Sequence, residues 1–546
     1  MNKKILKLNL ILILCIAGGC LLRVIDLNIR SLEYDEIWTL QHYFKYGFAE
    51  IFTNLETPNN HPLHTWLAKT LCSFAGYENW VLRLSAFLSG IALMAAAWLA
   101  AGKFFRSKYA KIALMALIAF SPYLVHYSNT ARGYSMQAFF VFVLIFLLFS
   151  CAGTPSWGKA FGIFFTAAAA LFTVYSGLIF ICAAGGAYLC SFFNWKDWKD
   201  ELKKNLFLFA AGADFCIVAA LWLGFNWEKI TKAQQFGTEI TSVMQFLQSS
   251  GHLIYDLGLS LPLVFIVVAL ILRPKDKIAR FGLVFVILTF LSMLVTKCGP
   301  ERVYVPMIAV VLFCAARGIE IIGARLRKYR YIELGSTIAL CLPLIFMQSD
   351  IERISPPDWR YFVTQIEKNT PDDCYVIYPA GDTYPIFVNY GESALNLAKR
   401  SQNELTMAGF ISPQKGVISA LAEDSSEKTL NPGKMLSFYP LSNNYGMSVY
   451  PVVPLSAQSW RKNPSLLVFF VFMPKEQYLA IRRMLFEKDE CYLLNAFFNR
   501  DLTDSSKGQV HRAIPFFIPA ASQSYSYYAK LAQAGGGRLK FYVVAE

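Results

Sequence analysis

The sequence has 546 residues, of which 55% are hydrophobic and only 16% are charged, and its mean hydropathy is +0.40. This composition excludes an ordinary soluble globular protein. In a soluble protein the formal net charge of +14 would suggest a nucleic-acid partner. Here the basic residues stand in short loops between apolar runs, where orientation in a membrane explains them better. We therefore expect no nucleic-acid partner.

Apolar runs long enough to cross a bilayer recur through the first two thirds of the chain. The first follows the basic start Met1-Asn2-Lys3-Lys4 without a small-residue cleavage site, so we expect a retained helix rather than a cleaved signal peptide. We predict about eleven transmembrane helices, near residues 5–26, 79–101, 111–126, 131–151, 158–174, 176–193, 206–224, 255–272, 281–296, 303–322 and 332–349.

Two segments between these runs are too polar to cross a membrane. His61–Gly76 is predicted to be a short amphipathic helix lying in the interface, and Phe225–His252 a longer outer loop. Asp214 falls in the middle of a predicted span, where a carboxylate is costly in lipid, so it is either functional or paired between helices.

Basic residues gather in every second loop, which is the positive-inside pattern. With the N-terminus in the cytoplasm, an odd number of spans places everything after Asp350 outside it. The four inside loops contain Lys103/Arg106/Lys108/Lys111, Lys196/Lys199/Lys203/Lys204, Arg273/Lys275/Lys277/Arg280 and Arg325/Arg327/Lys328/Arg330.

The last third of the chain has mixed polarity and alternates helical and strand patterns. Helices are predicted at Asp358–Asn369 and Lys475–Glu487, and strands at 374–379, 466–473 and 539–545. We therefore predict two domains: a transmembrane domain at 1–350 and a soluble, extracytoplasmic α/β domain at 351–546. Cys374 and Cys491 are the two cysteines of the second domain and could form a disulfide outside the cytoplasm.

Polar residues gather at the predicted outer ends of the spans, although they are far apart in the sequence. They are costly at the hydrocarbon boundary unless they face one another or a cavity, so we expect a shared outward-facing cavity. A carboxylate there can act as a general base, and arginines can hold a phosphate. The segments are 30–36, 59–62, 126–134, 173–176 and 297–306.

Several short motifs in this set, taken in order, resemble one family. They are Asp35-Glu36 after the first span, Asn60-His61-Pro62-Leu63, Arg83-Leu84, Ala131-Arg132-Gly133-Tyr134, 173–178 (TVYSGL), 302–306 (RVYVP) and Asp358-Trp359-Arg360. Over residues 1–375 the chain is similar to the bacterial glycosyltransferase family 39 group of the GT-C superfamily, whose relatives include protein O-mannosyltransferases and aminoarabinose transferases. It departs from that pattern by lacking a second proline after His61 and by an extra residue between Arg302 and Tyr304.

The resemblance implies a polytopic α-helical GT-C fold and an inverting glycosyltransferase in a bacterial inner (plasma) membrane. The donor would be a polyprenyl-phosphate sugar acting as co-substrate, with no other cofactor and no catalytic metal, and the acceptor a lipid, glycan or protein. Asp35 would be the general base and Glu36 would orient it or the acceptor. Arg132 and Arg302 would bind the donor phosphate, and the pocket would be lined by His61, Tyr134, Tyr175 and Tyr304.

Each residue also has a plainer reading. The acidic pair can be solvated, Arg132 can extend to the interface, Arg302 can pair with Glu301, His61 can merely start a helix, and the tyrosines can belong to the aromatic belt.

The alternative function is a polytopic transporter or lipid flippase without transferase activity. That class predicts charges at mid-membrane depth and pseudo-symmetric halves, whereas the sequence shows polarity at the outer edge and no repeat.

Overall fold

The computed structural model divides the chain into two compact units, Met1–Arg30 with Trp38–Ser355, and Ser31–Ile37 with Pro356–Glu546. Each unit is described by itself. The structure describes residues 3–25, 27–28, 30, 32–55, 59–233, 240–326, 328–329, 331–346 and seven strands between 375 and 545.

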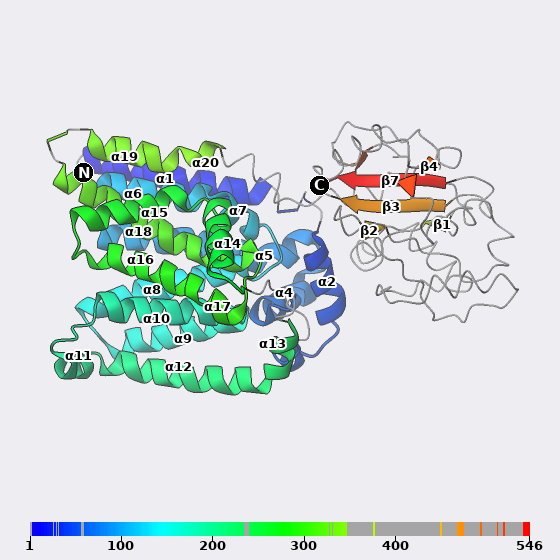
Figure 1. The fold of residues 1–546 in the computed structure, drawn as a ribbon, viewed down its shortest axis with the longest axis horizontal. Coiled ribbons are helices and arrows are strands. Elements are labelled where there is room, and N and C mark those ends of the chain that lie inside the picture. Colours follow the sequence, from blue (N-terminus) through cyan, green and yellow to red (C-terminus); the bar gives the residue numbers. More distant parts are fainter. Residues whose placement is uncertain are drawn as a thin grey trace, which may run out of the picture. The chain divides into compact units, whose positions relative to one another are not determined.

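The first unit is a bundle of helices whose long axes run side by side (Figure 1). Its longer helices are α1 (Lys3–Ile25), α5 (Asn79–Phe104), α6 (Lys108–Phe120), α8 (Tyr134–Gly153), α9 (Trp157–Thr173), α10 (Gly177–Ser191), α12 (Leu206–Phe225), α15 (Ser260–Leu272), α16 (Lys277–Leu291), α18 (Val305–Arg325) and α19 (Ile332–Cys341). Shorter or connecting helices are α2 (Tyr34–Tyr43, which begins in the other unit's segment), α3 (Phe48–Ile51), α4 (Pro62–Ala75), α7 (Pro122–Ser128), α11 (Trp198–Lys204), α13 (Trp227–Ala233), α14 (Val243–Asp256), α17 (Met293–Thr296), η2 (Glu301–Tyr304) and α20 (Pro343–Phe346).

Local sequence fixes where several helices begin. Ser107, Ser156 and Asp276 stand directly before α6, α9 and α16, and each side chain accepts a hydrogen bond from a backbone N–H of the first turn. Pro62 and Pro122 occupy the first turns of α4 and α7, where the missing N–H costs nothing. Pro122 also breaks one apolar run into α6 and α7, which meet at 48°.

Length and hydropathy qualify five described helical segments as membrane spans: Asn79–Phe104, Tyr134–Ala152, Leu206–Phe225, Lys277–Thr296 and Glu301–Arg325. Counting the bent pairs α6–α7 and α14–α15 as one span each raises the number to seven. Four shorter apolar helices lie at Leu10–Ile25, Trp157–Thr173, Gly177–Ser191 and Ile332–Cys341. The unit is therefore a polytopic helical membrane protein, and each of the eleven predicted segments contains one of these helices.

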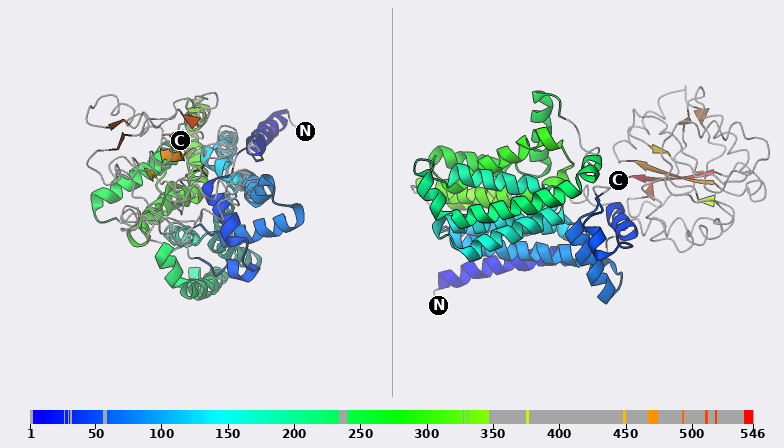
Figure 2. Two further views of the ribbon diagram at one scale, coloured as in Figure 1. Left: turned by 90° about the vertical axis from the view of Figure 1, so that its right-hand side faces the viewer. Right: turned by 90° about the horizontal axis from the view of Figure 1, so that it is seen from below.

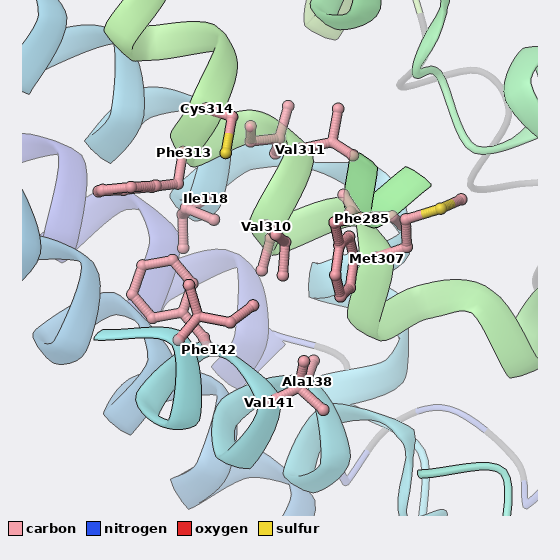
Figure 3. Packing of buried hydrophobic residues seen from close by; sticks show 14 of the residues in the cluster. Ile118, Ala138, Val141, Phe142, Phe285, Met307, Val310, Val311, Phe313 and Cys314 are labelled. Carbon is pink, nitrogen blue, oxygen red and sulfur yellow. The ribbon is translucent and has the colours of Figure 1, made fainter. Parts of the chain in front are cut away.

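The core of the bundle is built around α18. In this helix 89% of the apolar span window is buried, the largest share among the five qualifying spans. Figure 3 shows Val310, Val311 and Phe313 of α18 packed among side chains of neighbouring helices, including Phe142 and Phe285. Close packing of this kind gives the bundle a fixed scaffold on which its end loops are held.

Two predictions differ from the structure. Phe225–His252, expected as a loop, contains α13 and most of α14, and α14 meets α15 at 103°. The apolar positions of α14 are mixed with Gln and Ser, which hides a surface helix from a search for spans. Asp214 is exposed on α12, which contradicts its burial in a pair between helices, whereas a functional role stays a prediction. The helix predicted at His61–Gly76 is confirmed as α4.

In the second unit, strands β3 (Leu467–Met473) and β7 (Leu539–Ala545) pair in parallel over seven residues, from Leu467 with Leu539 to Met473 with Ala545. The sheet order is β1–β3–β7–β5, with β2 antiparallel on β3. The other strands are β1 (Tyr375–Val376), β2 (Ser448–Val449), β4 (Tyr492–Leu493), β5 (Val510–His511) and β6 (Phe517–Ile518), where β4 pairs with β6.

Both longer strands lie where the sequence predicts them, and the α/β domain itself stays a prediction. Figure 2 shows β3 and β7 side by side in a second orientation. The helices predicted at Asp358–Asn369 and Lys475–Glu487, the Asp358-Trp359-Arg360 motif and the cysteines Cys374 and Cys491 lie outside the described residues.

Candidate functional site

Most of the polar residues singled out in the sequence come from helix ends in the first unit, whereas Asp35 and Glu36 belong to the segment Ser31–Ile37 of the second unit. His61 is the N-cap of α4, and Arg132 lies in the short α7–α8 connection. The α9–α10 connection and η2 supply the remaining positions. In Figure 1, α4 and α17 lie toward one end of the bundle and α11 toward the other. Helix ends are natural places for such groups, because their backbone N–H and C=O groups need partners.

His61 is buried, with 1% of its surface exposed, and both of its ring nitrogens face donors. Nδ1 accepts the backbone N–H of Gly133 at 2.6 Å, and Nε2 lies 3.2 Å from Nη2 of Arg132. Because Nδ1 is an acceptor in a neutral ring, the proton must sit on Nε2. Nε2–H and the Arg132 guanidinium are then two donors side by side, an arrangement that a shared anionic acceptor would stabilise.

Burial lowers the pKa of His61 well below its ordinary value of 6.5. The positive charges of Arg132, His64 and Arg302 lower this pKa further. The ring is therefore neutral at pH 7 and offers a single N–H. The charge of Arg302 thus acts in the same direction as that of Arg132 on the pKa of His61.

Arg132 is 2% exposed and is positioned mainly by the loop before α4. Its Nη1 donates to the backbone oxygen of Asn59 at 2.8 Å and to Thr39 Oγ1 at 3.3 Å. Its Nη2 donates to the side-chain oxygen of Asn59 at 3.3 Å. The guanidinium also lies 5.8 Å from the ring centre of Tyr134, within cation–π range. A planar group held on this many sides keeps one orientation.

Gly133 has no side chain, and this lets its backbone lie close to His61 and Thr173. A Cβ atom at this position would lie 2.7 Å from Thr173 Cγ2 and 3.0 Å from His61 Nδ1. Tyr134 follows as the first residue of α8 and is buried, with its ring edge-on to His61 at 4.7 Å between centroids. The Ala-Arg-Gly-Tyr sequence thus supplies a cation, a close backbone approach and an aromatic wall in three consecutive residues.

The other predicted pocket residues occupy neighbouring connections. Tyr175 lies between α9 and α10, and burial together with nearby Tyr134 raises the pKa of its hydroxyl to about 12, so it remains a proton donor near neutral pH. Arg302 is half-buried in η2. Tyr304 is buried at the N-cap of α18, beside Cys298 and Gly299.

Asp35 and Glu36 form the first turn of α2. Glu36 is buried, and its Oε2 accepts the backbone N–H of Glu33 at 2.7 Å, which fixes the start of the helix. Asp35 is half-buried. Since adjacent side chains on a helix point about 100° apart, the two carboxylates have different surroundings. The separate roles expected for Asp35 and Glu36 stay predictions.

Two positioning residues were not proposed from the sequence. Asn59 supplies two of the oxygens that orient Arg132, and Thr39 supplies a third. The neighbouring Asn60 ties the loop together, since its amide nitrogen donates to the backbone oxygen of Ile51 at 2.8 Å. The one sequence signal was the Asn-Asn pair directly before His61-Pro62, because asparagine side chains readily bond to nearby backbone.

The described residues contain no group of three or more His, Cys, Asp or Glu side chains that could hold a metal ion. The cluster of His61, Arg132 and Tyr134 brings cationic and N–H donors beside an aromatic ring, and such donors are able to bind an anion.

Comparison with protein-family models finds no match, and none of the curated proteins matches. Among solved structures the chain is similar to ArnT from Cupriavidus metallidurans. The apo structure is 14% identical, with a TM-score of 0.46, and the match covers 72% of this chain and 88% of that one. The structure bound to undecaprenyl phosphate is 15% identical, with a TM-score of 0.45, and the match covers 71% and 87%. The resemblance expected from the sequence is thus accompanied by a structural similarity, which at this level does not assign the chain to a family.

Proposed function

We propose that this protein is an integral-membrane glycosyltransferase that moves a sugar from a polyprenyl-phosphate donor to a lipid, glycan or protein acceptor. The reaction would take place on the extracytoplasmic side of a bacterial plasma membrane. The observation that carries the proposal is the 3.2 Å approach of His61 Nε2 to Arg132 Nη2 in a buried site. Two donors at this distance favour an anionic oxygen that accepts from both.

A phosphate fits this site better than a simple carboxylate. It presents several acceptor oxygens, and Arg302 in η2 would supply a second guanidinium beside that of Arg132. The buried, partly aromatic surroundings strengthen each charge-assisted bond, since little water competes. The site lies at the end of a membrane bundle, where a phosphate on a lipid chain would arrive.

The proposed general base is Asp35, in the first turn of α2. In the proposed reaction an acceptor hydroxyl or amine attacks the anomeric carbon from the side opposite the phosphate. The bond from the anomeric carbon to the phosphate oxygen breaks, Asp35 takes the acceptor proton, and the configuration inverts.

The arginines and His61 would act on the leaving group. As the anomeric bond breaks, negative charge grows on the phosphate oxygen, and fixed donors stabilise that charge without reorganising. Glu36, held at the helix start, would orient the acceptor or Asp35. Tyr134, Tyr175 and Tyr304 would form the apolar walls against which the sugar and the first isoprene units pack.

The experiment is a transfer assay on the full-length protein in lipid nanodiscs, with undecaprenyl-phosphate sugars as donors and release of undecaprenyl phosphate as the readout. Asp35→Asn should lower the transfer rate by about 10²–10⁴-fold while leaving donor affinity unchanged. Arg132→Gln should weaken donor affinity by about 10–100-fold. The matched control is Arg325→Gln, an exposed arginine at the far end of α18.

Two substitutions of His61 separate its two nitrogens. Glutamine places an N–H group near the position of Nε2, whereas asparagine reproduces only the Nδ1 position. We expect donor affinity to be retained better in His61→Gln than in His61→Asn. Full transfer activity in Asp35→Asn would refute its role as base. Donor binding without transfer to any acceptor class, combined with movement of the lipid between leaflets, would favour a flippase.

A further inference from the structure

Arg30 joins the segment after α1 to the connection that carries Arg132. Its Nη1 donates to Nδ1 of His126, 2.9 Å away in the last turn of α7. Its Nη2 donates to the backbone oxygen of Asn129 at 2.7 Å and to Thr130 Oγ1 at 2.9 Å. One guanidinium group therefore holds the end of α7 and the start of the connection at three points.

The connection between α7 and α8 has no helical bonds of its own to fix Arg132. Residues 129–133 are not helical, and the backbone N–H of Arg132 bonds to the oxygen of Thr130 at 2.7 Å. The Thr130 hydroxyl also donates to the backbone oxygen of His126 at 2.9 Å. Because Arg132 follows Thr130 by two residues and is bonded to it, a shift of Thr130 would carry the Arg132 guanidinium with it.

Arg83 in turn fixes the backbone of Arg30. Arg83 lies on α5 and is fully buried. Its Nη1 donates to the backbone oxygens of Leu27 at 3.1 Å and of Arg30 at 2.9 Å. Carbonyl groups just beyond a helix end need such partners. The arginine of the Arg83-Leu84 motif thus holds the main chain from which the Arg30 side chain extends.

We propose that Arg30, held by Arg83, is a positioning residue for donor binding that keeps the guanidinium of Arg132 in the orientation a phosphate needs. This inference rests on the proposed function, and in it Arg30 acts through Arg132 without touching the donor. A planar group with two terminal nitrogens suits the task, because it bonds to a ring, a carbonyl and a hydroxyl at once. Lysine offers a single nitrogen in place of the two that Arg30 uses.

A double-mutant cycle on the full-length protein in lipid nanodiscs tests whether Arg30 acts through Arg132. The readout is the affinity for undecaprenyl phosphate. We expect Arg30→Met to lower this affinity about 10-fold in the otherwise unaltered protein. In the Arg132→Gln background the same change should lower it less than about twofold, because the group that Arg30 positions is already absent. Arg30→Lys should retain part of the affinity that Arg30→Met loses.

Thr130→Val is the second variant, and it replaces Arg30→Met in the cycle if that protein does not fold. Valine has nearly the size of threonine but removes one acceptor of Arg30, so we expect the affinity to fall about threefold. The matched control is Arg317→Met near the other end of α18, since Arg317 is also half-buried and bonds to Asp276 and Glu320. It should lower the unfolding temperature while leaving the affinity within about twofold.

Hydrogen exchange of the backbone amides at 129–133 gives a readout that needs no donor. Arg30→Met and Thr130→Val should speed this exchange, whereas Arg317→Met should not. If the unaltered protein does not bind undecaprenyl phosphate, the proposed function fails, and the exchange still supports or rejects the hold of Arg30 on the connection.

Two results would overturn the positioning role. An equal loss of affinity from Arg30→Met with and without Arg132 would make Arg30 an independent contact of the phosphate. Unchanged exchange at 129–133 in both Arg30→Met and Thr130→Val would show that the connection keeps its conformation without these bonds.

Discussion

Two buried arginines of the bundle, Arg23 and Arg132, are held in different ways. Arg23 of α1 donates from Nη1 to the backbone oxygens of Gly19 at 2.9 Å and Ala119 at 2.8 Å. Its Nη2 donates to Ile118 at 3.2 Å and its Nε to Ser128 Oγ at 3.2 Å. Arg132, by comparison, has the N–H donor of His61 directly beside one of its own nitrogens.

The difference separates the structural role of Arg23 from the binding role that we propose for Arg132. Arg23 satisfies carbonyl groups where Pro122 interrupts the run from α6 to α7, so its guanidinium replaces the helix bonds that the proline removes. At His61 and Arg132 two donors lie side by side, and this arrangement is the basis of the binding role that we propose. Burial of an arginine alone therefore does not distinguish the two roles.

The largest expected effect is a loss of stability when Arg23, the arginine with the structural role, is replaced. Arg23→Met leaves buried carbonyl oxygens without donors and should lower the free energy of unfolding by about 3 kcal/mol. Denaturation in detergent measures this loss, with Arg325→Met as the exposed control. Donor affinity, measured below the unfolding transition, should remain within about twofold of the original value. A variant that stays stable but no longer binds the donor would break the distinction.

Gly133→Ala should act mainly on the affinity for the donor. The added methyl group overlaps Thr173 Cγ2 and crowds His61 Nδ1, which pushes the imidazole away from the Gly133 N–H. Such overpacking costs about 1–3 kcal/mol, and we expect donor affinity to fall about 10-fold. Gly102→Ala in α5 is the control, since its Cβ would meet nothing within 4 Å. Equal affinity in both variants would show that the close approach at Gly133 is unnecessary.

The smallest expected effect is a pH dependence of stability from His61. Its pKa is lowered in the folded protein, so below about pH 6.5 the unfolded chain binds a proton that the folded chain does not. Stability is then fully present above that pH and falls as the pH decreases, by up to about 1.4 kcal/mol per unit. His61→Asn should have a shallower slope between pH 6.5 and 5, measured by denaturation. Identical slopes would mean that the ring is charged in the folded state.

Local patterns in the sequence accounted for much of the fold. Apolar runs located a helix in each of the eleven predicted segments, and His61-Pro62 marked the start of α4 because proline favours the first turn. The pattern failed for α14, whose apolar residues alternate with glutamine and serine. It also could not foresee that Asp214 faces outward, since the orientation of a span depends on its neighbours.

The site was predictable as a set of helix ends but not as a network. Ala131-Arg132-Gly133-Tyr134 identified the arginine and its aromatic neighbour from adjacent residues. The partners of Arg132 come from Asn59 and Thr39, more than seventy positions away. No short motif records such a tertiary hydrogen bond. The roles of Asp35 and Glu36 remain predictions that the transfer assay would test.

The last turns of α18 carry ion pairs. Arg317 Nη2 lies 2.9 Å from Asp276 Oδ2, and Glu320 accepts the N–H groups of Arg106 at 2.8 Å and Ser107 at 3.2 Å. These bonds join α18 to the starts of α16 and α6. If the bundle adjusts its width when a lipid enters, we expect it to pivot about this fastened end, with the widest excursion at η2. The most buried of the five qualifying spans would then stay fixed at its last turns and move most at its first turn.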